Sequence, residues 1–433
     1  MKAYLAFLGC KLNQSEMEAL RRQLAEAGWT LAAADEADVV VLNTCAVTAE
    51  AARKSRQMLR RLRAESPNAT IVATGCYAEL WPGEIEDAAR PDLIVNNQDK
   101  ARLAEILSNA AGATHLPATD LVDEESARQM HRPNRTRAFV KIQDGCDNAC
   151  AYCVVHIARG QSRSVAPETI IAEVRREANA RRREVVLTGV NIGAYGHDGG
   201  GSDLGGLTRR LLDETDIERI RLSSVEPWSF REEWLGLWEN PRLCRHLPLP
   251  LQSGSDAVLR RMNRPYSGGD FLHLARALHA ALPDLALTTD IIAGFPGETE
   301  ADHLDTLALA ESAGFARLHV FPFSPRPGTP AADMPSQVAR EDAERRCAEL
   351  RAHGMRLAST FAARFVGRTM DVLWEQSPKG NLWTGLTGNY LRVFAESESD
   401  LGNRIVATRL TETIKGGLRG QIATIDKGSG QRL

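Results

Sequence analysis

The sequence predicts an α/β protein in three parts: an N-terminal open parallel α/β sheet domain, a central incomplete β/α barrel and a small C-terminal β-barrel. Two observations lead to this fold class. Up to about residue 365, short segments of aliphatic and β-branched residues alternate with amphipathic helical segments, as in parallel sheets covered by helices. Beyond that point the helical segments stop, and short β segments follow one another with Gly, Asn and Asp between them.

The whole-chain properties fit a soluble globular protein better than a fibrous, disordered or membrane protein. At 433 residues the chain is too long for one core, so two or three domains are expected. A net charge of -3 excludes a uniformly basic protein, so any nucleic-acid surface must be local. No segment approaches the ~20 apolar residues of a membrane span, and the N-terminus lacks the features of a signal peptide. We therefore expect a cytoplasmic protein that has no membrane partner.

Residues 1–125 are expected to form the N-terminal domain. Its expected strands are 2–9, 37–44, 70–75 and 92–97, and its most amphipathic helical segments are 15–28 and 48–66. Residues 126–136 follow as a polar, basic linker that contains Pro133. The arginines Arg135 and Arg137 could contact RNA phosphates, although a solvated linker explains them equally well.

Residues 137–365 are expected to form the central domain. Six strand signals at 138–143, 184–189, 219–225, 246–252, 285–294 and 317–324 alternate with helical segments such as 167–183 and 271–282. Six parallel strands with crossover helices would build an incomplete β/α barrel, which helix 337–365 then closes. Residues 366–433 are expected to form the small β-barrel from segments 367–376, 382–388, 390–397, 402–413 and 418–423.

Eight cysteines in a large cytoplasmic protein are expected to stay reduced, because that compartment does not favour disulfides. Cys244 and Cys347 stand alone and are interpreted as structural. The other six cysteines form two groups of three.

The first group is Cys146, Cys150 and Cys153, whose spacing places three thiols on one tight loop. Three converging thiolates suit an iron–sulfur cluster, and a 4Fe–4S cluster bound by three of them keeps one iron open to a small molecule. A structural zinc site would need four closed ligands, and no second cysteine pair is present to provide them. The loop follows the first strand of the expected barrel, at the face where such folds carry their chemistry.

Four further strand ends of the barrel carry residues that could hold a cofactor. They are Gly189, Glu226, Gln252 and Asp290. Glycine lets the backbone approach a ligand, and the polar side chains could bind an amino group, a ribose or a carboxylate. Ordinary turn chemistry explains each of them singly about as well, so the interpretation rests on their common position at one face.

The second group is Cys10, Cys45 and Cys76, each of which directly follows an expected strand of the N-terminal sheet. Parallel strands end at the same edge of a sheet, so these three thiols could converge there. Buried free cysteines with no ligand are the alternative interpretation.

These features together resemble the methylthiotransferase family of radical S-adenosylmethionine (SAM) enzymes. The resemblance covers essentially the whole chain and rests on the blocks GCKLNQSE, LNTCAVT, TGCYAE, QDGCDNACAYC, ARGQSRS, LTGVNIGAYG, HLPLPLQSGS, TTDIIAGFPGETE and FSPRPGTPA. It implies that SAM binds the open iron of the first cluster and that one electron cleaves it to a 5′-deoxyadenosyl radical. It also implies a second 4Fe–4S cluster on Cys10, Cys45 and Cys76 that handles sulfur, and a second SAM that supplies the methyl group. Tyr152 matches the family position whose backbone lies near the adenine.

The terminal segment resembles the TRAM domain, which in this family binds RNA or otherwise holds the macromolecular substrate. Tyr390 and Arg392, with the nearby Trp383 and Phe394, provide the aromatic and basic mixture of such surfaces, although alternation in a barrel core explains them about as well. The partners that the resemblance implies are tRNA and an electron donor such as flavodoxin or ferredoxin; the sulfur source is not indicated.

Within the family, the motifs resemble most the branch that converts N6-threonylcarbamoyladenosine, next to the tRNA anticodon, to its 2-methylthio derivative. The isopentenyladenosine branch usually has GCQMN at the first cysteine, and the ribosomal-protein S12 branch has GCPKN. These two substrates are the alternatives; a non-catalytic RNA-binding iron–sulfur protein is a third that the open iron argues against. One departure is His156, which stands where the family usually has proline and leaves the shape of that loop open.

Overall fold

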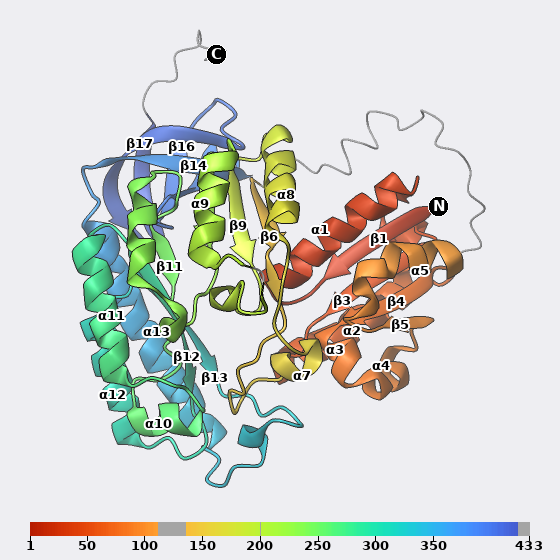
Figure 1. The fold of residues 1–433 in the computed structure, drawn as a ribbon, viewed down its shortest axis with the longest axis horizontal. Helices are drawn as coiled ribbons and strands as arrows, with labels where there is room; N and C mark the ends of the chain where they lie inside the picture. The colour runs from red at the N-terminus through yellow and green to blue at the C-terminus, as the bar shows by residue number, and fades with distance from the viewer. Residues whose placement is uncertain (111–135, 200, 423–433) are drawn as a thin grey trace.

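The computed structural model describes residues 1–110, 136–199 and 201–422. Three parts follow one another along the chain: an N-terminal sheet domain, a central partial barrel and a C-terminal barrel (Figure 1). The fold class predicted from the sequence is confirmed in all three parts. Most of the linker expected at 126–136, including Arg135, lies outside the described residues.

The N-terminal domain is a five-stranded parallel sheet in the order β2-β1-β3-β4-β5. Its strands are β1 (Lys2–Phe7), β2 (Thr30–Leu31), β3 (Val39–Thr44), β4 (Thr70–Gly75) and β5 (Leu93–Val95). Its helices are α1 (Lys11–Glu26), α2 (Ala49–Glu65), α3 (Cys76–Leu80), α4 (Pro82–Ala89) and α5 (Leu103–Ala110). All six residues of β3 are buried, which explains its continuous run VVVLNT: a central parallel strand is covered on both faces.

The central domain contains six parallel strands in two sheets, β10-β9-β6 and β11-β12-β13. These strands are β6 (Arg137–Lys141), β9 (Glu184–Thr188), β10 (Arg219–Leu222), β11 (His246–Pro248), β12 (Ala286–Ala293) and β13 (Arg317–Pro322). A parallel bridge between Ile220 of β10 and Leu243, just before β11, brings the two sheets side by side, so the strands run in sequence order around a partial barrel. Two short strands, β7 (Gln143–Asp144) and β8 (Arg163–Ser164), pair beside it.

Helices cover the outside of this partial barrel (Figure 1). The helices of this domain are α7 (Val155–Arg159), α8 (Pro167–Asn179), α9 (Leu204–Glu214), α10 (Asp256–Arg261), α11 (Gly268–Ala281), α12 (Glu300–Ala313) and α13 (Arg340–Ala363). The strand expected at 246–252 stops at Pro248. Pro248 and Pro250 have no N–H to donate to a strand ladder, which explains the early end.

The C-terminal part is a closed five-stranded barrel in the order β14-β15-β16-β18-β17. Its strands are β14 (Thr369–Lys379), β15 (Leu382–Thr387), β16 (Arg392–Glu396), β17 (Arg404–Ile414) and β18 (Gly417–Ile422). Trp374, Val393 and Leu410 fill its core together with Phe365, from the turn after α13. This shared core joins the small barrel to the central domain.

The N-terminal domain lies against the first strand of the partial barrel. Helix α1 runs beside β6, and α3 packs against α7, the helix that follows the three-cysteine loop (Figure 1). The C-terminal ends of the N-terminal sheet therefore face the cysteine loop of the barrel. No helix in the described ranges is long and apolar enough to cross a membrane.

Candidate active site

The three-cysteine loop begins where β7 ends and is shaped by Gln143. This fully buried side chain donates from Nε2 to the carbonyl of Gly145 at 2.7 Å and to Ser162 Oγ at 2.9 Å. Its Oε1 accepts from the backbone amides of Val190 and Asn191 at 3.0 and 2.8 Å. One amide side chain thus ties the start of the loop to the loop after β9. Gln143 was not among the predicted site residues; its signal in the sequence is a polar residue that ends a buried strand.

Each sulfur of this loop receives a hydrogen-bond donor. The backbone amide of Asn148 donates to Cys146 Sγ at 3.4 Å, and that of Val155 donates to Cys153 Sγ at 3.4 Å. The guanidinium of Arg264 donates to Cys150 Sγ at 3.5 Å. Donors aimed at all three sulfurs suit thiolates that share a cluster, because such bonds stabilise the charge on sulfur.

Burial keeps a thiol of this loop protonated unless a metal cluster binds it and replaces the proton. All eight cysteines are free thiols. Burial raises the pKa of Cys153 to about 12, so its thiolate does not form by itself at neutral pH. A metal cluster would replace those protons, since ligation requires the thiolate. No described group of His, Cys, Asp or Glu is spaced for a single metal ion, whereas a cluster with an iron at each corner binds its thiolates farther apart.

His156, where the family usually has proline, lies in the first turn of α7. The backbone carbonyl of His156 accepts from the amide of Gly160 at 2.9 Å, and the helix forms normally. Proline is tolerated at the same place because the first turn of a helix needs no N–H. The loop shape therefore does not depend on this exchange.

The second triad lies at the ends of three adjacent strands. Cys10 precedes α1, Cys45 follows β3 and Cys76 begins α3. The register pairs Thr44 with Gly75, so Cys45 and Cys76 follow paired positions. Burial raises the pKa of Cys45 to about 11, and both other thiols contribute to this shift, which indicates that the three lie within electrostatic reach of one another.

Gly9 makes room for this convergence. Its φ is +94°, and a Cβ atom at this position would lie 2.5 Å from Cys45 Sγ. Only glycine tolerates both the backbone conformation and this close approach. The residues present therefore fit a bulky inorganic group held by three thiols.

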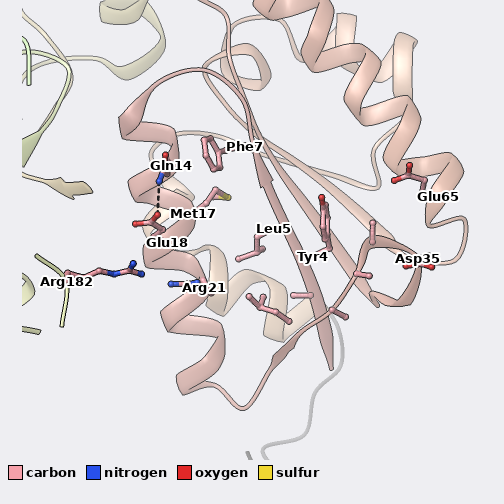
Figure 2. A pocket seen from close by; sticks show the side chains of 15 residues that line it. Tyr4, Leu5, Phe7, Gln14, Met17, Glu18, Arg21, Asp35, Glu65 and Arg182 are labelled. Atoms are coloured by element: carbon pink, nitrogen blue, oxygen red, sulfur yellow. Dashed lines mark hydrogen bonds between the residues drawn. The ribbon is translucent and has the colours of Figure 1, made fainter. Parts of the chain in front are cut away.

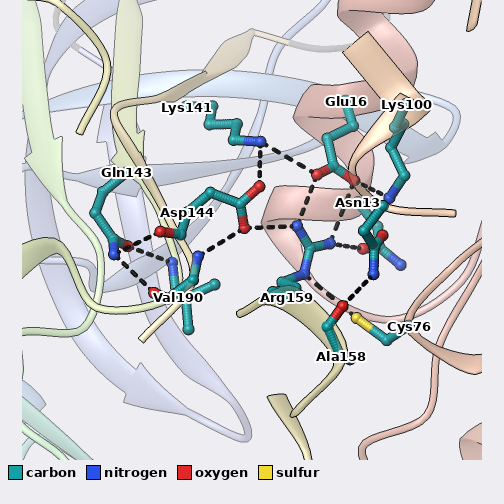
Figure 3. Close-up of polar contacts among 12 residues, drawn as sticks. Asn13, Glu16, Cys76, Lys100, Lys141, Gln143, Asp144, Ala158, Arg159 and Val190 are labelled. Atoms are coloured by element: carbon teal, nitrogen blue, oxygen red, sulfur yellow. Dashed lines mark hydrogen bonds and ion pairs between the residues drawn. The ribbon is translucent and has the colours of Figure 1, made fainter. Parts of the chain in front are cut away.

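A buried polar network links Cys76 of the second triad to Asp144, at the start of the three-cysteine loop, with Arg159 at its centre (Figure 3). Arg159 ends α7 in the barrel domain, yet its Nε donates to Cys76 Sγ of the N-terminal domain at 3.3 Å. Its Nη1 pairs with Glu16 Oε1 at 2.7 Å and with Asp144 Oδ1 at 2.9 Å. Burial opposes ionisation of Glu16, but Arg159 and Lys100 outweigh it and hold its pKa well below the usual value. No role for Arg159 was predicted from the sequence.

Two of the expected cofactor residues make contacts within the protein. A Cβ at Gly189 would lie 2.8 Å from the carbonyl oxygen of Gln143, so this glycine allows the close approach of the cysteine loop. Glu226 accepts two hydrogen bonds from Arg264, the arginine that reaches Cys150. The structure thus connects Glu226 to the cluster loop.

Of the other three candidates, Gln252 and Asp290 have side chains less committed to the fold, whereas Tyr152 is packed into it. Gln252 adopts a φ of +64°, unusual for a residue other than glycine, while its backbone bridges to Ile291 of β12. Such strain is common at ligand sites. Asp290 lies 3.4 Å from His319 Nδ1, and both are partly exposed. Tyr152 packs against the apolar cluster that includes Phe295, and burial raises its pKa well above the usual value.

A cavity of about 160 Å³ lies directly against the cysteine loop. Its lining comprises Asp147, Asn148, Asn191, Ala194, His197, Trp228, Ser229 and Arg231. Asn148 Nδ2 and Asn191 Oδ1 are buried and have no hydrogen-bond partner among the described residues. One donor and one acceptor are therefore available there to a bound molecule.

A larger groove of about 1160 Å³ lies along β1 and α1 of the N-terminal domain (Figure 2). Tyr4, Leu5 and Phe7 line it from the strand, and Met17 and Arg21 line it from the helix. No cysteine is among its lining residues. This groove is therefore separate from both cysteine triads.

Of the residues expected to contact RNA, two take part in the packing between domains. Arg137 pairs with Glu375 of the C-terminal barrel at 2.9 Å. The ring of Tyr390 stacks on His246 of β11 with centroids 4.3 Å apart. Arg392 is exposed at the start of β16. Trp383 Nε1 donates to a backbone carbonyl at 3.2 Å within the barrel.

Comparison with known proteins agrees with this architecture. Residues 2–112 match the family model described as uncharacterized protein family UPF0004, and residues 140–310 match the Radical SAM superfamily. Among solved structures, the radical SAM methyltransferase TsrM from Kitasatospora setae superposes with a TM-score of 0.57 at 14% identity, over 76% of this chain and 77% of that chain. The fold and the cysteine loop thus define an enzyme of the radical SAM superfamily, with SAM and a 4Fe–4S cluster as cofactors.

Full-length relatives narrow this class. The chain is 35% identical to the threonylcarbamoyladenosine tRNA methylthiotransferase MtaB of Bacillus subtilis strain 168, over 93% of this chain and 92% of the relative. It is also 35% identical to the threonylcarbamoyladenosine tRNA methylthiotransferase MtaB of Thermotoga maritima, over 92% of this chain and 91% of that relative. The tRNA-2-methylthio-N(6)-dimethylallyladenosine synthase of Cereibacter sphaeroides ATCC 17025 is 35% identical to this chain, over 97% of this chain and 98% of that relative. The chain belongs to the methylthiotransferase family of radical SAM enzymes.

Proposed function

We propose that this protein is a tRNA methylthiotransferase that converts N6-threonylcarbamoyladenosine to its 2-methylthio derivative. The observation that carries the proposal is the pair of cysteine triads in adjacent domains, with Arg159 linking Cys76 of one triad to Asp144, two residues before the other. Relatives of both tRNA branches match at about the same identity, so tRNA is the shared substrate class. In this proposal residues 1–125 hold the second cluster, 137–365 perform the radical chemistry and 366–433 hold RNA.

The chain's own residues divide the work in this proposal. When bound, the two clusters and SAM supply the radical, the sulfur and the methyl group that convert a C–H bond into C–S–CH3. The amides of Asn148 and Val155 and the guanidinium of Arg264 stabilise the thiolates of the barrel triad. The strained Gln252, together with Asp290 and Tyr152, is proposed to hold SAM. A ring C–H is not acidic, which is why no general base is required.

The choice of nucleoside is supported by Lys11, the first residue of α1 and the neighbour of Cys10. Its side chain is half-buried, and no described carboxylate lies within ion-pair distance of its ammonium group. Burial lowers the pKa of Lys11. Tyr390 and Asp290 raise this pKa and Arg137 lowers it, so the ammonium group lies within electrostatic reach of these residues. A cation that pairs with no described carboxylate, next to Cys10 in the chain and near residues of the barrel, suits the carboxylate of a threonylcarbamoyl group better than an uncharged isopentenyl group.

The substrate is tested with anaerobically reconstituted enzyme, SAM, a reductant such as reduced flavodoxin, and tRNA that carries either N6-threonylcarbamoyladenosine or isopentenyladenosine. Mass spectrometry of the nucleosides should find the 2-methylthio product only from the first tRNA. Lys11→Gln should lower conversion at least tenfold, and the matched control Lys11→Arg should keep most of it. Product formed from isopentenyladenosine tRNA or on ribosomal protein S12, with the threonylcarbamoyl tRNA unchanged, would reject the choice of nucleoside.

The second cluster has its own test. Reconstituted enzyme should bind about eight irons, and changing Cys146, Cys150 and Cys153 to Ala should leave about four. Changing Cys10, Cys45 and Cys76 to Ala should also leave about four, with formation of 5′-deoxyadenosine but no methylthio product. A wild-type content near four irons would reject the second cluster.

A further inference from the structure

Arg159 contacts the N-terminal triad although it belongs to the barrel domain. It follows Cys153 by one short helix, and its side chain is only 1% exposed. Nε donates to Cys76 Sγ at 3.3 Å, and Nη2 donates to Asn13 Oδ1 at 2.9 Å. Among the hydrogen bonds of the described residues, the Arg159–Cys76 bond is the one that joins a triad sulfur to the other domain.

Carboxylates on both sides hold this guanidinium in place (Figure 3). Glu16 of α1 binds it from the N-terminal domain, and Asp144, two residues before Cys146, binds it from the barrel. Lys100 and Lys141 neutralise the excess negative charge, at 2.8 Å from Glu16 and 2.5 Å from Asp144. A buried ion network with all its members paired has one preferred geometry, so the position of Arg159 against the sulfur is well determined.

Arg264 is the counterpart of Arg159 at the barrel triad. It donates to Cys150 Sγ at 3.5 Å, pairs with Glu226 and lies 4.4 Å from the ring centre of Trp228. Both arginines are buried beside one cysteine of a triad, and both are paired with carboxylates. They differ in that Arg264 and its cysteine share a domain, whereas Arg159 crosses the boundary.

We propose that Arg159 is a positioning residue for the N-terminal cluster, which fixes Cys76 from the barrel domain and raises the reduction potential of that cluster. The inference rests on the proposed second cluster at Cys10, Cys45 and Cys76. A hydrogen bond from a cation to a ligand sulfur favours the more negative, reduced cluster, so loss of the bond lowers the potential. Because the same guanidinium binds Asp144, the contact also ties the N-terminal cluster to the start of the loop that holds the other cluster.

The test uses full-length protein in which Cys146, Cys150 and Cys153 are Ala, so that the proposed N-terminal cluster is the one observed. Its midpoint potential is measured by electron paramagnetic resonance during an anaerobic redox titration. Arg159→Gln should lower the equilibrium constant for one-electron reduction about tenfold, which is about 59 mV. Arg159→Lys keeps the charge without the planar fork and should shift the midpoint less. Arg264→Lys, the matched control in the same background, should leave it unchanged.

The outcomes separate the two proposals. No iron in the parent protein, with Arg159 intact, would overturn the second cluster and with it this inference. A cluster that forms but has the same midpoint with Arg, Lys or Gln at position 159 would overturn the role of Arg159 alone. An equal shift from Arg264→Lys would also overturn it, because the effect would then be general. If Arg159→Gln binds no iron, the midpoint potentials of the parent protein and of Arg159→Lys are compared instead. A lower midpoint with Lys supports the role of Arg159, and an equal midpoint overturns it.

Discussion

Replacing Arg221 with Met would remove the buried cation that joins the central domain to the C-terminal barrel. The Arg221 side chain is 1% exposed and binds both carboxylate oxygens of Glu184, at 2.7 and 3.0 Å. The same guanidinium donates to the carbonyls of Gly388 and Thr387, at 3.0 and 3.3 Å. Burial opposes ionisation of Glu184, but Arg221 outweighs it and keeps the pKa of the carboxyl below its usual value.

The expected decrease in the free energy of unfolding follows from these contacts. Removing one partner of a buried pair costs about 3–5 kcal/mol, because the other charge stays buried and unpaired. Each hydrogen bond lost to a carbonyl adds about 1 kcal/mol. Arg219, 3.9 Å from Glu184, offsets part of this, although its own Nη atoms are bound to carbonyls of the C-terminal barrel. We expect Arg221→Met to lower the free energy of unfolding by about 4 kcal/mol.

Urea unfolding of the cluster-free protein, followed by tryptophan fluorescence, gives this difference from the shift in midpoint and the slope. Adding Glu184→Met to Arg221→Met should recover part of the loss, because the unpaired carboxylate is no longer buried, while Arg219 keeps its hydrogen bonds to carbonyls of the C-terminal barrel. A loss below about 1 kcal/mol for Arg221→Met would refute the reasoning. So would a double variant that is no more stable than the single one.

Two further changes test the site and the domain contact. Gly9→Ala places a Cβ against Cys45 Sγ at a φ of +94°, so iron analysis should find about half the wild-type content, and a full content would contradict the proposed packing of the second triad. His246 is buried, and burial, followed by the charge of Arg221, lowers its pKa well below the usual value. The unfolded chain therefore binds a proton below about pH 6.5 that the folded protein does not, and stability present above that pH is lost as the pH falls, at most about 1.4 kcal/mol per pH unit. His246→Asn should make the free energy of unfolding, measured by urea titration, fall less steeply between about pH 6.5 and 5. An unchanged pH dependence would show that His246 binds its proton equally well in the folded and unfolded protein.

The sequence by itself determined the fold class and singled out two groups of three cysteines. Alternating strand and helix segments predicted the parallel sheets of the N-terminal and central domains, because the pattern of burial along a chain follows directly from its residues. The positions of Cys10, Cys45 and Cys76 directly after strands predicted their common edge, since parallel strands end on the same side. Cys244 and Cys347 are buried, as expected for structural cysteines.

Tertiary structure alone decided which polar residues support those cysteines. Arg159 contacts Cys76 across 83 positions of the sequence and Glu16 across 143 positions. Neither contact has a local signal in the sequence, because each depends on how the N-terminal domain packs against the barrel domain. Tyr390 was expected at an RNA surface; it lies in the turn between β15 and β16 and stacks on His246, and the residues of a turn do not reveal which neighbouring domain covers them. Local residue patterns determine which segments pair within a domain, whereas the partners of long charged side chains are set only after the domains have packed.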